Sequence, residues 1–254
     1  MPTNIYIRMA EHPQVILDTM DKIKRERFRR RQQKLFGYKV SAALFLLGVI
    51  LFLLDKFLRF GSIFQYTGFI LWCAAIAGGA LSFRAPLPSW PKNQFEAARR
   101  ILYTLRDDTG RKGRVVGWLD LTGPMQPKKR VRTARSRSGK KKQYYRDPWF
   151  KVKIKLADGN LLRLTFVDIV KQKAGSIVDH RTNFTAKLVY NPSIYKVGHI
   201  PQAELPLPGT RVSISDGIII LKAGVKRNPI PVREILETLK AVYERLEPLS
   251  PLKG

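Results

Sequence analysis

The chain has 254 residues, of which 47 are Lys or Arg and 19 are Asp or Glu, so that its formal net charge is +28. This length allows one or two domains, and the charge favours an anionic partner such as lipid headgroups, an acidic protein or nucleic acid. The single cysteine, Cys73, excludes an intramolecular disulfide, a cysteine-based zinc site and a CxxC redox pair.

Two apolar stretches separated by a short charged turn predict a transmembrane hairpin over residues 38–83. The first stretch, Val40 to Leu54, is apolar apart from Ser41, and the second, Ser62 to Phe83, has no charged residue. A bilayer core of about 30 Å takes about 20 apolar helical residues, so we expect each stretch to cross the membrane once. The polar start of the chain and the length of the apolar run argue against a cleaved signal peptide.

Small residues in the second stretch predict close packing of a helix. Pairs of small residues four positions apart let two helix backbones approach each other, and we expect this contact to lie within the hairpin. Contact with another membrane protein is the alternative. The residues concerned are Ala74, Ala75, Gly78 and Gly79.

The basic residues predict the orientation of the hairpin. Lys and Arg are frequent before and after it, whereas its turn holds only Lys56 and Arg59. Because positive charge marks the cytoplasmic side, we expect an integral two-pass protein with both termini cytoplasmic, in a bacterial inner membrane or its organellar equivalent. Residues 1–37 are expected to be a basic juxtamembrane segment, with a helix from Pro13 that lies on the anionic leaflet.

A proline-rich exit and a short amphipathic helix are expected over residues 84–110, before a β domain over residues 111–254. In that domain, Phe150 to Leu156 alternates strictly between apolar residues and lysine, which is typical of a half-buried strand. Asp158-Gly159 predicts a tight turn to a return strand. Further strands are expected at 114–122, 184–190, 211–215 and 218–222, and a C-terminal amphipathic helix at 231–247.

The expected fold is therefore a membrane α-helical hairpin followed by an α+β cytoplasmic domain. Short strands separated by turns favour a small antiparallel β-barrel or sandwich, and the C-terminal helix would cover its open end or one face. This architecture is similar to that of pleckstrin-homology-like domains, although no residue motif supports the likeness, and an OB-like barrel fits equally well.

Residues 128–142 predict a loosely ordered basic loop, which is followed by Tyr144, Tyr145 and Trp149. Phosphate contacts and base stacking could bind single-stranded nucleic acid there. A loop tethered near a membrane meets lipid phosphates at high effective concentration, so we favour anionic headgroups or an acidic protein surface. A solvated loop that only keeps the domain soluble is the alternative. The residues expected to bind an anionic partner are Lys128, Lys129, Arg130, Arg132, Arg135, Arg137, Lys140, Lys141, Lys142, Lys151, Lys153 and Lys155.

The sequence assigns no catalytic residue, cofactor or metal. His12, His180 and His199 are the only histidines, and none has a partner at metal-ligand spacing. Residues 110–117 lack the spacing of a phosphate-binding loop. We therefore expect a non-enzymatic accessory or scaffold subunit that binds lipid or another protein. A membrane-tethered nucleic-acid-binding protein and a membrane enzyme with an unrecognised site are the alternatives.

Overall fold

The computed structural model describes residues 5–58, 62–84, 91–110, 113–136, 138–226 and 229–249. These fall into two compact units. The helical unit holds residues 21–84 of the described chain, and the β unit holds residues 5–20 together with residues 91–249. The two units are connected both by a continuous helix and by the chain that follows residue 84.

The helical unit consists of two helices packed antiparallel. Helix α1 (Pro13–Leu58) has 46 residues and begins within the β unit, and helix α2 (Ser62–Arg84) has 23. Trp72 of α2 donates a hydrogen bond from Nε1 to the carbonyl oxygen of Phe45, 3.2 Å away, and its ring stacks on that of Phe45. The backbones come closest where Gly48 faces Gly68, since a Cβ on Gly48 would lie 2.9 Å from the Gly68 carbonyl oxygen. Close backbone approach at paired glycines is typical of tightly packed helices.

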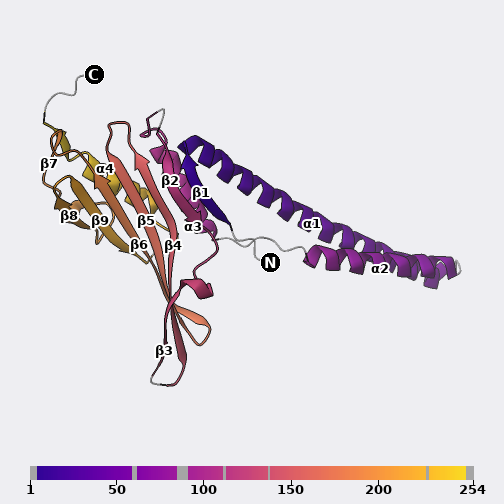
Figure 1. Cartoon of the computed structure of the whole chain (residues 1–254). Coiled ribbons are helices and arrows are strands. Elements are labelled where there is room, and N and C mark those ends of the chain that lie inside the picture. The colour runs from indigo at the N-terminus through magenta and orange to yellow at the C-terminus, as the bar shows by residue number, and fades with distance from the viewer. Residues whose placement is uncertain are drawn as a thin grey trace. The chain divides into compact units, whose positions relative to one another are not determined.

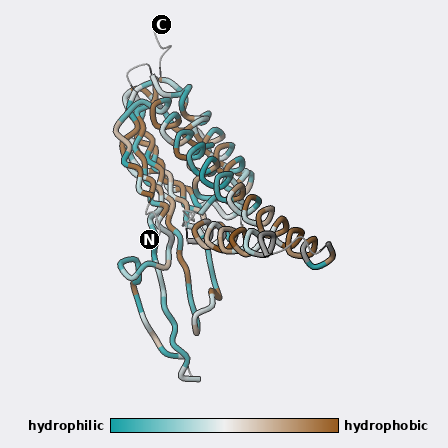
Figure 2. Tube along the Cα trace, turned by 90° about the vertical axis from the view of Figure 1, so that its right-hand side faces the viewer, coloured by the Kyte–Doolittle hydropathy of each residue, from teal (hydrophilic) through white to brown (hydrophobic). Residues whose placement is uncertain are grey.

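Length and composition identify one candidate membrane-spanning helix among the described residues, namely Pro13–Leu54 of α1. Only 6% of its apolar window is buried, so most of its apolar side chains are accessible in this structure. The apolar part of α2, Tyr66–Leu81, is shorter. Large apolar side chains are exposed on both helices, including Leu46, Ile50 and Ile70, and the hydrophobic stretch is visible in Figure 2.

The β unit is built on one large antiparallel sheet (Figure 1). Its strands run in the order β1-β2-β4-β5-β6-β9-β8, and β3 pairs with the free end of β4. A second, two-stranded sheet joins β10 to β7. The strands are β1 (Tyr6–Glu11), β2 (Val115–Asp120), β3 (Arg130–Arg135), β4 (Lys141–Lys155), β5 (Leu161–Lys173), β6 (Ser176–Val189), β7 (Tyr195–Val197), β8 (Arg211–Ser215), β9 (Ile218–Val225) and β10 (Leu246–Pro248). The helical elements of the unit are α3 (Lys92–Leu105), α4 (Val232–Tyr243) and the 3-10 turns η1 (Pro127–Lys129) and η2 (Gln202–Glu204).

The large sheet does not close into the expected barrel, because its edge strands β1 and β8 do not pair with each other in the described chain. Helices supply the cover instead. Gln94 of α3 and Thr238 of α4 are buried, and both form hydrogen bonds to residues outside their own helices. We call the covered side of the sheet the core face and the opposite side the outer face.

The predicted alternation in β4 is confirmed. Phe150, Val152 and Ile154 are fully buried on the core face, whereas the lysines between them are exposed on the outer face. Phe150, Phe166 and Phe184 lie directly opposite one another on β4, β5 and β6, and their ring centroids are 5.8 and 5.1 Å apart. Aromatic contacts across strands therefore form the centre of the core.

Three features differ from the sequence analysis. Residues 6–11 form β1, which pairs with β2 and buries Ile7 and Met9, so part of the expected juxtamembrane segment belongs to the sheet. The C-terminal helix ends at Tyr243, and Leu246 lies in β10. α1 also continues without a break through residue 37, where the basic segment was expected to meet the first membrane helix.

Candidate anion-binding face

The outer face of the sheet carries a row of side chains that crosses seven strands. Residues directly opposite one another along this row are Arg8, Trp118, Lys151, Thr165, Thr185, Lys222 and Arg211. Lys151 Nζ lies 5.1 Å from the centroid of the Trp118 ring, which is a cation–π contact. This row contains four cations and no carboxylate.

The next row brings Lys153, Arg163 and Lys187 directly opposite one another on β4, β5 and β6. Neighbouring strands are about 4.8 Å apart, and like charges facing each other at that spacing destabilise a sheet. A bound anion would offset this repulsion. The register of the sheet thus concentrates positive charge on one face.

The predicted loose loop over residues 128–142 has defined structure at residues 128–136 and 138–142, which corrects that part of the sequence analysis. It consists of η1, β3, a turn and the start of β4. With the end of β5 and the start of β6 it forms an extension of the sheet, which we call the basic arm (residues 130–146 and 169–182; Figure 1). The strands form despite their charge because β3 pairs with β4, and β4 in turn pairs with β5.

The outer side of the basic arm combines cations with an aromatic ring. Arg132, Tyr144 and Lys171 lie opposite one another on β3, β4 and β5. The Arg132 guanidinium and the Lys171 ammonium are 6.0 and 5.9 Å from the centroid of the Tyr144 ring. The only acidic residue within the arm is Asp179.

Most of the cations that the sequence analysis selected are exposed. Lys142 is half-buried, and Arg137 lies outside the described residues. The exposed ones are Lys128, Arg130, Arg132, Arg135, Lys140, Lys141, Lys151, Lys153 and Lys155.

Lys129 was wrongly assigned to the binding surface, because its side chain is buried in an ion-pair cluster. Its Nζ lies 2.9 Å from Asp120 Oδ2 and 2.7 Å from Asp147 Oδ1, and it donates to Thr122 Oγ1 and the Gly123 carbonyl oxygen. All of its hydrogen-bonding capacity is used internally, so it cannot bind an external anion. Its role is to fix η1, and hence the start of β3, to the sheet.

The carboxyl groups of this cluster respond differently to their surroundings. Burial raises the pKa of Asp147 to about 6, although the Lys129 ammonium opposes this. Burial also disfavours ionisation of Asp120, but hydrogen bonds from Thr122 and the charge of Lys129 outweigh it and lower the pKa of Asp120. The ionised form of Asp147 therefore depends more on the Lys129 ammonium than that of Asp120 does.

A third buried carboxylate, that of Asp168, lies at the base of the basic arm, and its role was missed from the sequence. Asp168 Oδ1 accepts hydrogen bonds from Trp149 Nε1 and Thr182 Oγ1 at 3.0 and 2.8 Å. Its Oδ2 lies 2.6 Å from Gln94 Nε2 and 2.9 Å from His180 Nε2. The hydrogen bond to Asp168 raises the pKa of His180. These bonds tie α3, β4, β5 and β6 together.

The small residues of α2 lie in different environments. Ala75 is buried, Gly78 and Gly79 are half-buried, and Ala74 is exposed. A Cβ on Gly78 would lie 3.0 Å from the Ser41 hydroxyl oxygen of α1. Gly78 and Gly79 therefore face the other helix of the unit, whereas Ala74 faces away.

A cavity of about 680 Å³ lies between α3, α4 and the core face. It is lined mainly by apolar side chains such as Leu105, Leu162 and Leu188, with carboxylates such as Asp108 and Glu237 among the lining residues. Within the described parts of the chain, no group of three His, Cys, Asp or Glu side chains could hold a metal ion. Titratable side chains also line this cavity, and among them the Tyr243 hydroxyl donates a hydrogen bond to Asp158.

Comparison of the chain with protein-family models, curated proteins and solved structures finds no match.

Proposed function

We propose that this protein is a non-catalytic, two-pass membrane anchor that holds a basic β unit against anionic lipid headgroups on the cytoplasmic side. It would act as an accessory or scaffold subunit. The outer face and the basic arm are the surfaces that contact the headgroups.

The pairing of β1 with β2 is the observation that carries the two-pass proposal. β1 precedes the helical unit in the chain and β2 follows it, yet the two strands are hydrogen-bonded neighbours over six residue pairs. Both strands must therefore lie on the same side of any membrane that the chain crosses. An even number of crossings satisfies this condition, and a single crossing by α1 does not.

The exposed apolar surface of the helical unit supports insertion of both helices. Phe69 and Ile76 on α2 are about two-thirds exposed, as is Leu46 on α1. Apolar surface of this extent is stable in lipid but costly in water. The Lys and Arg residues that flank the hairpin favour the cytoplasm for the β unit.

The charge of the outer face supports the lipid partner. Each basic residue near an anionic leaflet contributes about 1 kcal/mol of attraction, so even part of the face or arm would hold the unit at the surface. Tethering favours lipid over soluble anions because headgroups are always close to the anchored unit.

The topology is tested by cysteine labelling of the full-length protein in intact cells, with Cys73 replaced by serine. A membrane-impermeant maleimide should label Lys56→Cys, in the last turn of α1, and should not label Lys140→Cys on the basic arm. After cell lysis both should react. Labelling of Lys140→Cys from outside, or resistance of Lys56→Cys, would show that the topology is wrong.

The lipid contact is tested with the full-length protein in nanodiscs. A fluorophore on Lys140→Cys should be quenched by headgroup spin-labelled lipid, and more strongly when anionic lipid is added. Changing Arg130, Arg132 and Arg135 to Gln should remove the increase. The charge-matched control changes Lys196, Lys240 and Arg245 to Gln and should retain it. Equal quenching in both triple variants would refute a role for the arm.

A further inference from the structure

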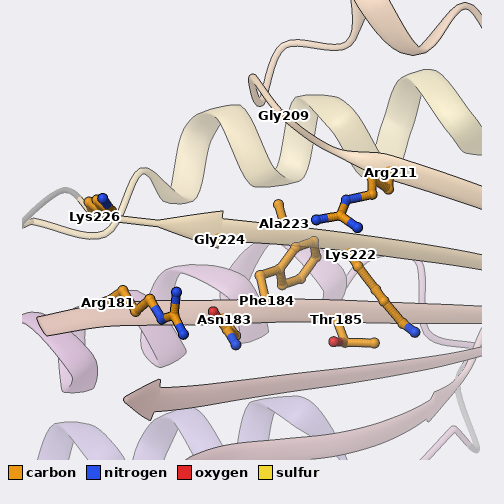
Figure 3. A pocket seen from close by; sticks show the side chains of 10 residues that line it. All are labelled: Arg181, Asn183, Phe184, Thr185, Gly209, Arg211, Lys222, Ala223, Gly224 and Lys226. Carbon is orange, nitrogen blue, oxygen red and sulfur yellow. The ribbon is translucent and has the colours of Figure 1, made fainter. Parts of the chain in front are cut away.

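A hollow on the outer face surrounds Gly224, which lies near the end of β9, beside the edge strand β8 (Figure 3). Its volume is about 390 Å³, and it is open to solvent. Gly224 lies opposite Asn183 on β6, and Gly209 just before β8 also lines the hollow. The two glycines leave a gap where neighbouring positions carry long side chains.

The backbone does not require glycine at position 224. Its φ is not in the left-handed region, and a Cβ added there would meet only Asn183 Oδ1, at an ordinary contact distance of 3.7 Å. Glycine inside a strand weakens it and often marks a place where a ligand approaches the backbone closely. Here the missing side chain makes the floor of the hollow accessible.

Four cations surround this floor. Lys222 and Arg211 lie opposite each other on one side of Gly224, and Arg181 and Lys226 lie on the other side. Lys222 and Lys226 are each two residues from Gly224, a distance of about 7 Å along a strand, which their long side chains can span. None of the four forms an ion pair within the described chain, and no carboxylate lines the hollow.

Two neutral groups complete the lining. Asn183 supplies an amide and Thr185 a hydroxyl, and both are half-buried on β6. Two guanidinium groups offer the planar pair of N–H donors that matches a phosphate group, while the ammonium groups add point charges. Charge and donor geometry therefore both select phosphate oxygens.

We propose that this hollow is a binding site for a compound that carries at least two phosphate groups. Each phosphate monoester has a charge of about −1.5 to −2 at pH 7, so two of them neutralise the four cations. The site deepens the proposed function, because lipid headgroups with added phosphates have this chemistry. A soluble polyphosphate has it too, and the two sources are separated by experiment.

The test uses the full-length protein in nanodiscs of uncharged phosphatidylcholine, with inositol 1,4,5-trisphosphate as the probe in isothermal titration calorimetry. Gly224→Leu fills the hollow without changing the charge and should weaken binding at least about tenfold, which is about 1.4 kcal/mol. Arg211→Gln should weaken it similarly. The matched controls, Ser215→Leu and Lys155→Gln, place the same changes elsewhere on the outer face and should alter affinity less than about twofold.

The sources are separated by repeating the titration with phosphatidylinositol 4,5-bisphosphate in the nanodisc. Competition by this lipid, lost in Gly224→Leu, supports a headgroup ligand, whereas a lipid without effect supports a soluble one. The site is refuted if the wild type does not bind the probe, if Gly224→Leu binds normally, or if Lys155→Gln and Arg211→Gln lose equal affinity.

Thermal unfolding of each variant is the control for folding. Gly224 and Lys155 are exposed, so both variants should keep the wild-type midpoint. The cysteine-labelling pattern described above is independent of this hollow. A negative result for phosphate binding would therefore leave the proposed membrane topology unaffected. A negative result for the topology would likewise leave the phosphate site unaffected.

Discussion

Replacing Lys129 by methionine is expected to destabilise the β unit strongly at pH 8. Methionine keeps the apolar part of the side chain but removes the ammonium that lies 2.7 Å from Asp147 Oδ1, and the Asp147 side chain is completely buried. Removing one partner of a buried ion pair costs about 3–5 kcal/mol, because the other charge is left uncompensated. For a unit of this size, 1 kcal/mol corresponds to about 2–4 °C, so the midpoint of thermal unfolding should fall by about 6–20 °C.

The loss should be smaller at pH 5, and this dependence identifies the cause. Burial raises the pKa of Asp147 to about 6. A raised folded-state pKa means that the protonated carboxyl favours the fold, and that this contribution is lost as the pH rises through about 6. At pH 5 the carboxyl can take up a proton, so the absent lysine matters less.

The assay is thermal unfolding of the detergent-solubilised full-length protein, followed by circular dichroism at pH 5 and pH 8. Lys128→Met, at the exposed neighbouring position, should change the midpoint by no more than about 1 °C at either pH. Adding Asp147→Asn to Lys129→Met should recover much of the loss at pH 8. A Lys129→Met midpoint within about 2 °C of the wild type at pH 8, or an equal loss at both pH values, would refute this account of the cluster.

Three further predictions concern other contacts. The raised pKa of His180 means that its bond to Asp168 stabilises the fold below about pH 6.5, and that this stability is lost as the pH rises through the folded-state pKa. His180→Gln should therefore reduce the pH dependence of the unfolding midpoint over that range. An unchanged pH dependence would contradict this. Trp149→Phe removes the indole donor to Asp168 and should cost about 1–3 kcal/mol in thermal unfolding, whereas an unchanged midpoint would show that the bond contributes nothing. Gly48→Leu would place atoms against Trp72 of α2 and should destabilise the helix pair by about 1–3 kcal/mol in a detergent-unfolding assay. Ala43→Leu, at an exposed site, should not destabilise it. Equal effects of the two changes would argue against the close glycine contact.

Local patterns in the sequence predict the elements whose partners are close in the chain. The strict alternation from Phe150 to Leu156 and the turn at Gly159 suffice for the β4–β5 hairpin, because strand period and turn chemistry are local properties. The short strand β1 has no such signal, because its partner β2 is separated from it by residues 12–114. The sequence also does not predict that the sheet stays open, because this depends on where the helices pack.

The candidate site shows the same division. The exposure of Lys151, Lys153 and Lys155 follows from the alternation of side chains between the two faces of a strand. Burial of Lys129 could not be predicted, since its two carboxylate partners come from different strands and a basic run normally indicates a solvated segment. The hollow at Gly224 depends on the mutual register of β6, β8 and β9, which no single segment encodes.

The position of β1 before the helices also determines the order of events during synthesis. At about 5–20 residues per second, a ribosome needs about 5–20 s to make the residues between β1 and its partner β2. The first strand must remain without its partner throughout this time, because β2 follows both helices in the chain. A nascent chain that ends before residue 115 would therefore contain both α1 and α2 but lack the sheet partner of β1.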